Sequence, residues 1–79
     1  MSDIQPDVTL DCKGLSCPMP VLKTKKALDA MKTGEVLRVV ATDPGSKADI
    51  PALLRRTGNE LIETKEEGNT FIFLIKKTV

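Results

Sequence analysis

The sequence has no histidine, tryptophan or tyrosine, and aromatic residues make up only 3% of the chain. Without histidine, no Cys-His or Ser-His-Asp nucleophile pair and no histidine-based metal site can form. Rings for base stacking are scarce and the net charge is only +1, which argues against direct nucleic-acid binding. The two cysteines, Cys12 and Cys17, cannot close a structural zinc site within one chain, so we expect no metal.

Long hydrophobic runs are also missing. No stretch approaches the roughly 20 apolar residues that a membrane-spanning helix needs. Residues 1–7 are acidic and lack the apolar stretch of a secretory signal. We therefore expect a cytoplasmic protein with no membrane partner, in a compartment where a free thiol is more common than a disulfide.

The residues that are present indicate one small folded domain. The chain has 79 residues, of which 41% are hydrophobic and 29% are charged, an ordinary composition for a globular protein. We expect residues 1–7 to form a flexible tail and residues 8–79 to form a single domain.

Alternating patterns and turn residues predict four strands, at residues 8–12, 35–42, 59–65 and 70–77. Helical periodicity predicts a first helix that begins at Cys17 and stops near Gly34, and a second that ends at Gly58. The start of the second helix stays open, because either Ser46 or Asp49 can cap it.

The resulting element order is βαβαββ, with a hairpin turn at residues 66–69. This order predicts an α/β fold of the α+β type, a two-layer sandwich in which two helices cover one face of a four-stranded mixed sheet. The first two strands would be parallel through a helical crossover, and the last two antiparallel.

Cys17 is the candidate reactive residue, because it stands where a turn meets the predicted helix start. The partial positive charge of a helix N-terminus stabilises a thiolate, so we expect a lowered pKa for this thiol. Pro18 and Pro20 suit the first helical turn and would hold the sulfur at a rigid, exposed corner. Both lack an N–H group, which leaves Met19 and Val21 as backbone donors near the sulfur.

Four lysines lie near this corner in the sequence: Lys13, Lys23, Lys25 and Lys26. Such a group commonly forms only a solvated helix face. The alternative is that these lysines steer the corner toward an acidic partner surface, which is an effect on association rate that salt weakens.

Cys12 has three interpretations: a small core residue, a resolving thiol, or half of a reversible disulfide. Strand alternation points Val8, Leu10 and Cys12 to the same face, which favours the core residue.

Residues 10–20, Leu-Asp-Cys-Lys-Gly-Leu-Ser-Cys-Pro-Met-Pro, resemble the signature of the TusA/SirA-like sulfur-carrier family. In that signature, Leu-Asp and a glycine, here Gly14, precede a Cys-Pro-x-Pro motif. Further matches are Asp-Pro at 43–44, Asp-Ile-Pro at 49–51 and Gly-Asn-Glu-Leu at 58–61. The resemblance extends over nearly the whole chain, from residue 10 to residue 77.

The resemblance implies that Cys17 accepts sulfane sulfur as a persulfide from a cysteine desulfurase or a rhodanese-like donor and passes it to an acceptor protein. It implies a carrier that is loaded and unloaded once per cycle, with no cofactor besides the covalent sulfur. The relays known for the family end in tRNA 2-thiouridine, in dissimilatory sulfur oxidation or in molybdenum-cofactor supply. Family members often lack a cysteine at the position of Cys12, so this second thiol is not expected to be essential.

Two other functions stay open at this point. One is a dithiol redox protein that uses Cys12 and Cys17 together. The other is a non-catalytic regulatory interaction module, in which replacing Cys17 by serine would leave function intact. Dependence on Cys12 separates the first from a carrier, because a redox pair needs both thiols.

Overall fold

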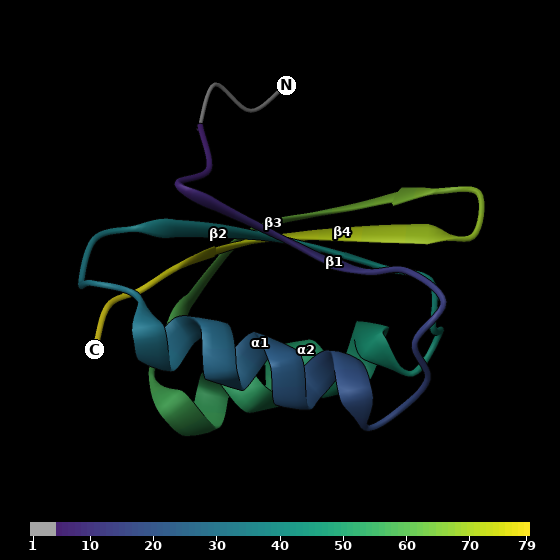
Figure 1. Ribbon diagram of the computed structural model, residues 1–79, viewed down its shortest axis with the longest axis horizontal. Coiled ribbons are helices and arrows are strands. Elements are labelled where there is room, and N and C mark those ends of the chain that lie inside the picture. Colours follow the sequence, from purple (N-terminus) through teal and green to yellow (C-terminus); the bar gives the residue numbers. More distant parts are fainter. Residues whose placement is uncertain (1–4) are drawn as a thin grey trace.

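The computed structural model describes residues 5–79 and contains two helices and four strands in two layers (Figure 1). The elements are, in chain order, β1 (Val8–Cys12), α1 (Met19–Ala30), β2 (Val36–Ala41), α2 (Ser46–Thr57), β3 (Glu60–Glu67) and β4 (Thr70–Lys76). Both helices lie against the same side of the sheet (Figure 1). The predicted two-layer βαβαββ sandwich is therefore confirmed.

The sheet has the order β1-β2-β4-β3. Strand β1 pairs with β2 in parallel and β3 pairs with β4 antiparallel, as predicted. Strand β4 also pairs antiparallel with β2, a pairing that the sequence analysis did not predict. The register pairs Cys12 with Ala41, the last residues of β1 and β2. Because the two strands run in the same direction, the loops that follow them leave the sheet at the same edge. That edge holds the candidate site.

The core lies between the sheet and the helices. The central strands contribute inward-facing apolar side chains that are almost fully buried, among them Leu37, Val39, Phe73 and Ile75. They pack against buried residues of the two helices: Leu28, Ile50 and Leu54. Ile50 and Leu54 stand one helical turn apart, at the spacing from which this helix was predicted. Lys23, Lys25 and Lys26 of α1 stay exposed.

The first helix begins at Met19 and not at Cys17, so the sequence-based prediction was wrong by two residues. The N–H of Met19 donates to the carbonyl oxygen of Ser16 at 2.9 Å, which closes a turn ahead of the helix. Pro18 is the capping residue, and Pro20 falls within the first two helical positions. Cys17 therefore belongs to the loop, just outside the helix.

The start of α2 differs from both predicted alternatives. The helix begins at Ser46, with Gly45 as the capping residue and no side-chain cap. The N–H groups of Ser46, Lys47 and Ala48 donate to carbonyl oxygens three residues earlier, which forms a tight first turn. Pro51 consequently lies inside the helix. The end was predicted correctly, since Gly58 caps the helix with φ 85°.

The hairpin turn is shorter than predicted. Strand β3 continues through Glu67 and pairs that residue with Thr70 of β4, so only Gly68 and Asn69 connect the strands. Gly68 takes φ 60°, a left-handed conformation that glycine adopts at little cost. The register of this pair shifts between Leu61 and Glu63.

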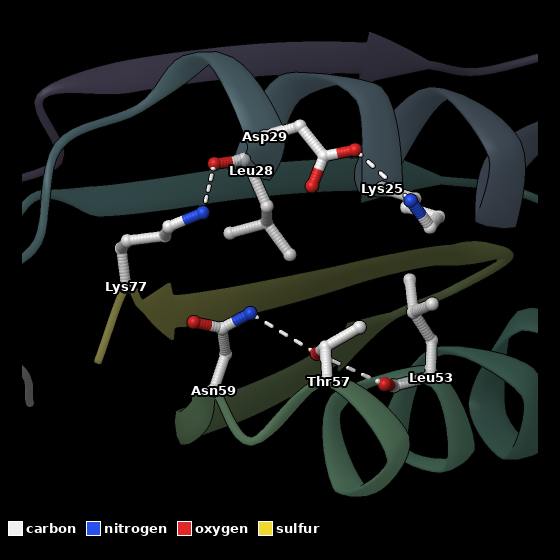
Figure 2. A network of polar contacts seen from close by, with 7 residues as sticks. All are labelled: Lys25, Leu28, Asp29, Leu53, Thr57, Asn59 and Lys77. Atoms are coloured by element: carbon white, nitrogen blue, oxygen red, sulfur yellow. Dashed lines mark hydrogen bonds and ion pairs between the residues drawn. The ribbon is translucent and has the colours of Figure 1, made fainter. Parts of the chain in front are cut away.

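Polar contacts gather where the two helices end (Figure 2). The Lys77 ammonium donates to the carbonyl oxygen of Leu28 at 2.6 Å. The Thr57 hydroxyl donates to the carbonyl oxygen of Leu53, and the amide of Asn59 donates to Thr57, both at 3.0 Å. These bonds satisfy polar groups where the helices stop.

Of the expected N-terminal tail, residues 1–4 lie outside the described residues. Asp7, its last residue, is held to Val36 by two hydrogen bonds of 2.8 Å. Within the described part of the chain, neither helix is long and apolar enough to cross a lipid bilayer.

Candidate functional site

The candidate site is built on the loop between β1 and α1. Its central residue is Cys17, whose thiol is free and exposed at the corner that was predicted for it. The loop leaves the sheet through Gly14, which has φ 80° and so needs a residue without a side chain. The N–H of Gly14 donates to the Thr42 hydroxyl at 2.9 Å, which fastens this loop to the loop after β2.

Two carboxylates from other parts of the chain contact Cys17. The Cys17 thiol donates a hydrogen bond to Oδ2 of Asp49, with 3.2 Å between sulfur and oxygen. The Cys17 backbone N–H donates to Oδ2 of Asp43 at 3.1 Å. Asp43 lies two residues after the end of β2, and Asp49 lies in the first turn of α2. The parallel pairing of β1 with β2 therefore places both acids beside the cysteine.

These contacts raise the pKa of the Cys17 thiol, opposite to the predicted lowering. The main cause is the hydrogen bond to Asp49, with partial desolvation and the negative charges of Asp49 and Asp43 acting in the same direction. The N-terminus of α1 does little to lower this pKa, because Pro18 and Pro20 have no N–H and the N–H of Met19 donates to the carbonyl oxygen of Ser16. At neutral pH the thiol is accordingly held in its protonated form.

The thiol opens onto a shallow groove of about 560 Å³ between the two helices. One wall comes from the start of α1 and the other from the exposed side of α2, and the lining residues are Cys17, Pro18, Val21, Asp49, Ala52, Arg55 and Arg56. The groove thus has an acidic group next to the sulfur and two arginines further along α2. A partner segment that enters it can reach the sulfur directly.

The other predicted supporting residues occupy different surroundings. Pro20 is buried beneath the loop, and its carbonyl oxygen accepts a bond from the buried Thr24 hydroxyl at 2.7 Å. Met19 is 41% exposed beside the corner. Neither lines the groove, so Pro20 supports the loop from below and Met19 adds apolar surface around it.

The four lysines do not line the groove with Cys17. All four are exposed: Lys13, Lys23, Lys25 and Lys26. Lys25 is paired with Asp29 one helical turn away at 3.0 Å. A docking role for these lysines stays a prediction, and the cations nearest the groove are Arg55 and Arg56, which the sequence reasoning did not select.

Cys12 lies at the end of β1 with no exposed surface and belongs to the main core cluster. Burial raises the pKa of its thiol, against a smaller lowering effect of the Lys23 charge. A protonated thiol without solvent access is a poor nucleophile. This position fits the core interpretation of Cys12 better than a resolving thiol.

Replacing Cys12 by alanine and by serine is expected to give different stabilities. Alanine loses only a small apolar volume, whereas serine also buries a hydroxyl in an apolar core, at a cost of roughly 1–3 kcal/mol. Urea unfolding of both variants measures the difference. A serine variant as stable as the alanine variant would show that a polar partner for the hydroxyl exists at this position.

No metal centre is evident in the part of the chain that the structure describes: no three His, Cys, Asp or Glu side chains of residues 5–79 are grouped to hold an ion. The chemistry that the site offers is that of one accessible sulfur atom flanked by two carboxylates.

Comparisons with known proteins agree on one family. The family model described as sulfurtransferase TusA matches residues 8–77. The chain is 58% identical over 72 residues to the sulfur carrier protein TusA of Allochromatium vinosum, covering 91% of this chain and 95% of that protein. It is 45% identical to the putative sulfur carrier protein YrkI of Bacillus subtilis, covering 90% and 95%. A crystal structure of a SirA-like protein from Desulfitobacterium hafniense shares the fold, with a TM-score of 0.78 at 24% identity over 91% of this chain and 99% of that one.

Proposed function

The chain belongs to the TusA sulfurtransferase family, and on that premise we propose that it is a sulfur carrier that holds the transferred sulfur as a persulfide on Cys17. The observation that supports this assignment best is the position of the thiol. Cys17 is the exposed one of the two cysteines and opens onto a groove that a partner protein can enter. A carrier needs this accessibility twice, once for loading and once for delivery.

The proposed chemistry is thiol exchange without net oxidation. In loading, the Cys17 sulfur attacks the outer sulfur of a donor persulfide, a new S–S bond forms, and the donor cysteine leaves as a thiol after taking up a proton. In delivery, an acceptor thiol attacks the outer sulfur of the Cys17 persulfide, and Cys17 leaves as a thiol. The protein contributes an accessible sulfur, a fixed position and a docking surface.

A carrier has a sulfur donor and a sulfur acceptor as partners. For the donor we propose a cysteine desulfurase or a rhodanese-like protein, and for the acceptor a protein with a reactive thiol. Delivery toward tRNA 2-thiouridine, toward sulfur oxidation and toward molybdenum-cofactor supply are three versions of this proposal, which differ only in the acceptor.

The dithiol redox alternative receives less support, since Cys12 has no exposed surface while Cys17 is exposed. In the structure the two cysteines are not bridged. The non-catalytic module is also less well supported, because that function would not use the exposed thiol of Cys17.

Sulfur loading tests the carrier proposal directly. We expect the reduced wild type and the Cys12→Ala variant to gain whole sulfur atoms in intact mass after incubation with cysteine desulfurase and cysteine, or with polysulfide. A reductant should remove the gain. The proposal fails if neither protein gains sulfur or if the gain requires Cys12. A loss of two hydrogen atoms from the wild type would instead favour the dithiol redox protein.

A further inference from the structure

Asp49 is placed to control the state of the thiol that the proposed function uses. Its carboxylate accepts the hydrogen bond from the Cys17 sulfur at 3.2 Å, so the sulfur must carry its proton for this bond to exist. Asp43 adds a second negative charge on the backbone side of the same residue. A thiolate in this position would face two carboxylates and would lose the hydrogen bond.

Among the residues that the structure describes, no cation forms an ion pair with Asp49. Within residues 5–79 the ion pairs are Lys25 with Asp29 and Lys47 with Glu66, and neither includes Asp49. Val21 of α1 and the capping residue Pro18, both uncharged, line the other side of the groove. The groove cations, Arg55 and Arg56, follow Asp49 by six and seven residues, which is about 9 Å and about 10.5 Å along the helix axis.

The proposed transfer nevertheless requires a nucleophilic sulfur, and the nucleophile in thiol exchange is the thiolate. The isolated carrier therefore holds its reactive atom in the less reactive form. Asp49 is half-buried at the groove beside Cys17, where a docked protein can reach it. A positive charge brought to this carboxylate would weaken its hold on the thiol proton and favour the thiolate.

We propose that Asp49 is a positioning residue that keeps Cys17 protonated in the free carrier, and that the sulfur donor releases the thiolate by docking a cationic side chain against the Asp49 carboxylate. This inference rests on the proposed carrier function. It adds a requirement for the partner: the donor presents a lysine or arginine close to the cysteine that bears its persulfide.

The step balances without an oxidant or reductant. When the donor cation pairs with Asp49, the Cys17 thiol releases its proton to solvent. The thiolate attacks the outer sulfur of the donor persulfide, forming one S–S bond while the donor's S–S bond breaks. The donor cysteine leaves as a thiolate and takes up a proton from solvent, so one thiol and one persulfide are present before and after transfer.

The first test is the rate of alkylation of the free protein by iodoacetamide as a function of pH. Asp49→Asn keeps the size of the side chain and removes its charge. We expect this variant to react roughly three- to tenfold faster than wild type near pH 7, with the midpoint of its pH profile moved to lower pH. Asp29→Asn, which removes one charge from an exposed site on α1, is the matched control and should follow the wild-type profile.

The second test is sulfur loading from a protein donor, cysteine desulfurase with cysteine, compared at equal concentrations. We expect Asp49→Asn to load more slowly than wild type, because the carboxylate that receives the donor cation is gone. A faster reaction with iodoacetamide combined with slower loading from the donor supports the proposal. An unchanged or slower alkylation, or donor loading as fast as wild type, overturns it.

The mass spectra of the alkylated proteins also report the fold. A disordered variant would expose Cys12 and take up two alkyl groups, while a folded one takes up only one, on Cys17. Failure of this inference is distinct from failure of the carrier function. If Asp49 has no such role, the wild type still gains sulfur, whereas if the protein is no carrier, no variant gains any.

Discussion

Replacing Cys17 by serine is expected to abolish sulfur loading and onward delivery while leaving the fold intact. A hydroxyl cannot form a persulfide, so no residual activity from this position is expected, and the buried Cys12 does not substitute for it. Because Cys17 is exposed, the change removes no core packing, and thermal unfolding should stay close to that of the wild type. Intact mass measures loading, and transfer of labelled sulfur to an acceptor thiol measures delivery.

The matched control for this experiment is Ser16→Ala, a change in the exposed neighbour of Cys17. The Ser16 backbone carbonyl that closes the turn with Met19 is retained in this variant. We expect it to load sulfur like the wild type. Sulfur gain in Cys17→Ser that reductant removes would contradict the assignment of the carrier residue.

Replacing Phe73 by alanine is expected to lower the free energy of unfolding by about 3–5 kcal/mol. Phe73 is only 1% exposed and lies in the core on the central strand β4, paired with Val39 on one side and Thr64 on the other. A domain of this size has a total stability of roughly 4–12 kcal/mol, so the loss removes a large share of it. Urea unfolding measures the change.

The neighbouring residue Ile72 provides the comparison for this variant. Ile72 is half-buried, and strand alternation places it on the opposite side of β4 from Phe73. The side of the sheet away from the helices makes fewer apolar contacts, so Ile72→Ala should cost less than Phe73→Ala. Equal losses for the two variants would mean that the open face of the sheet contributes as much packing as the covered one.

The architecture could be predicted from the sequence because each element carries its own local signal. The alternation in residues 8–12 points to a face of which the structure buries Cys12 fully and Leu10 partly, while Val8 stays exposed. The apolar spacing of the helices points to residues that lie in the core, among them Leu28, Ile50 and Leu54. The errors concern ends of elements. The helix starts were predicted wrongly because backbone turns at Ser16 and Asp43 determine where each helix begins. The hairpin turn was predicted with too many residues because the strands pair up to Glu67. The secondary-structure propensities of single residues do not reveal such backbone turns or strand pairings.

The candidate site was predictable only in part. The proline-flanked cysteine and the turn glycine stand next to each other in the sequence, and their roles follow from local geometry. The two carboxylates were missed because Asp43 and Asp49 lie 26 and 32 residues from Cys17 in the sequence. Each is also a common residue type at its own position, Asp43 in a turn and Asp49 near a helix start. The direction of the Cys17 pKa shift was wrong for the same reason, since the helix end alone was considered. A clue was available: Asp43 directly follows the strand that was predicted to pair with 8–12.

The sheet order has a consequence for how copies of the protein meet. Within residues 5–79, the edge strands β1 and β3 have no strand partner along their outer sides, which leaves backbone groups there open to another strand. Strand β1 offers only five residues, and β3 carries four glutamates and one lysine among its eight. A second copy that adds its own β3 edge to edge would bring these acidic runs together, and like charges on facing strands repel. Strand β3, which takes no part in the site, thus disfavours pairing with the β3 strand of a second copy through its charge, and the exposed sulfur lies on another part of the molecule.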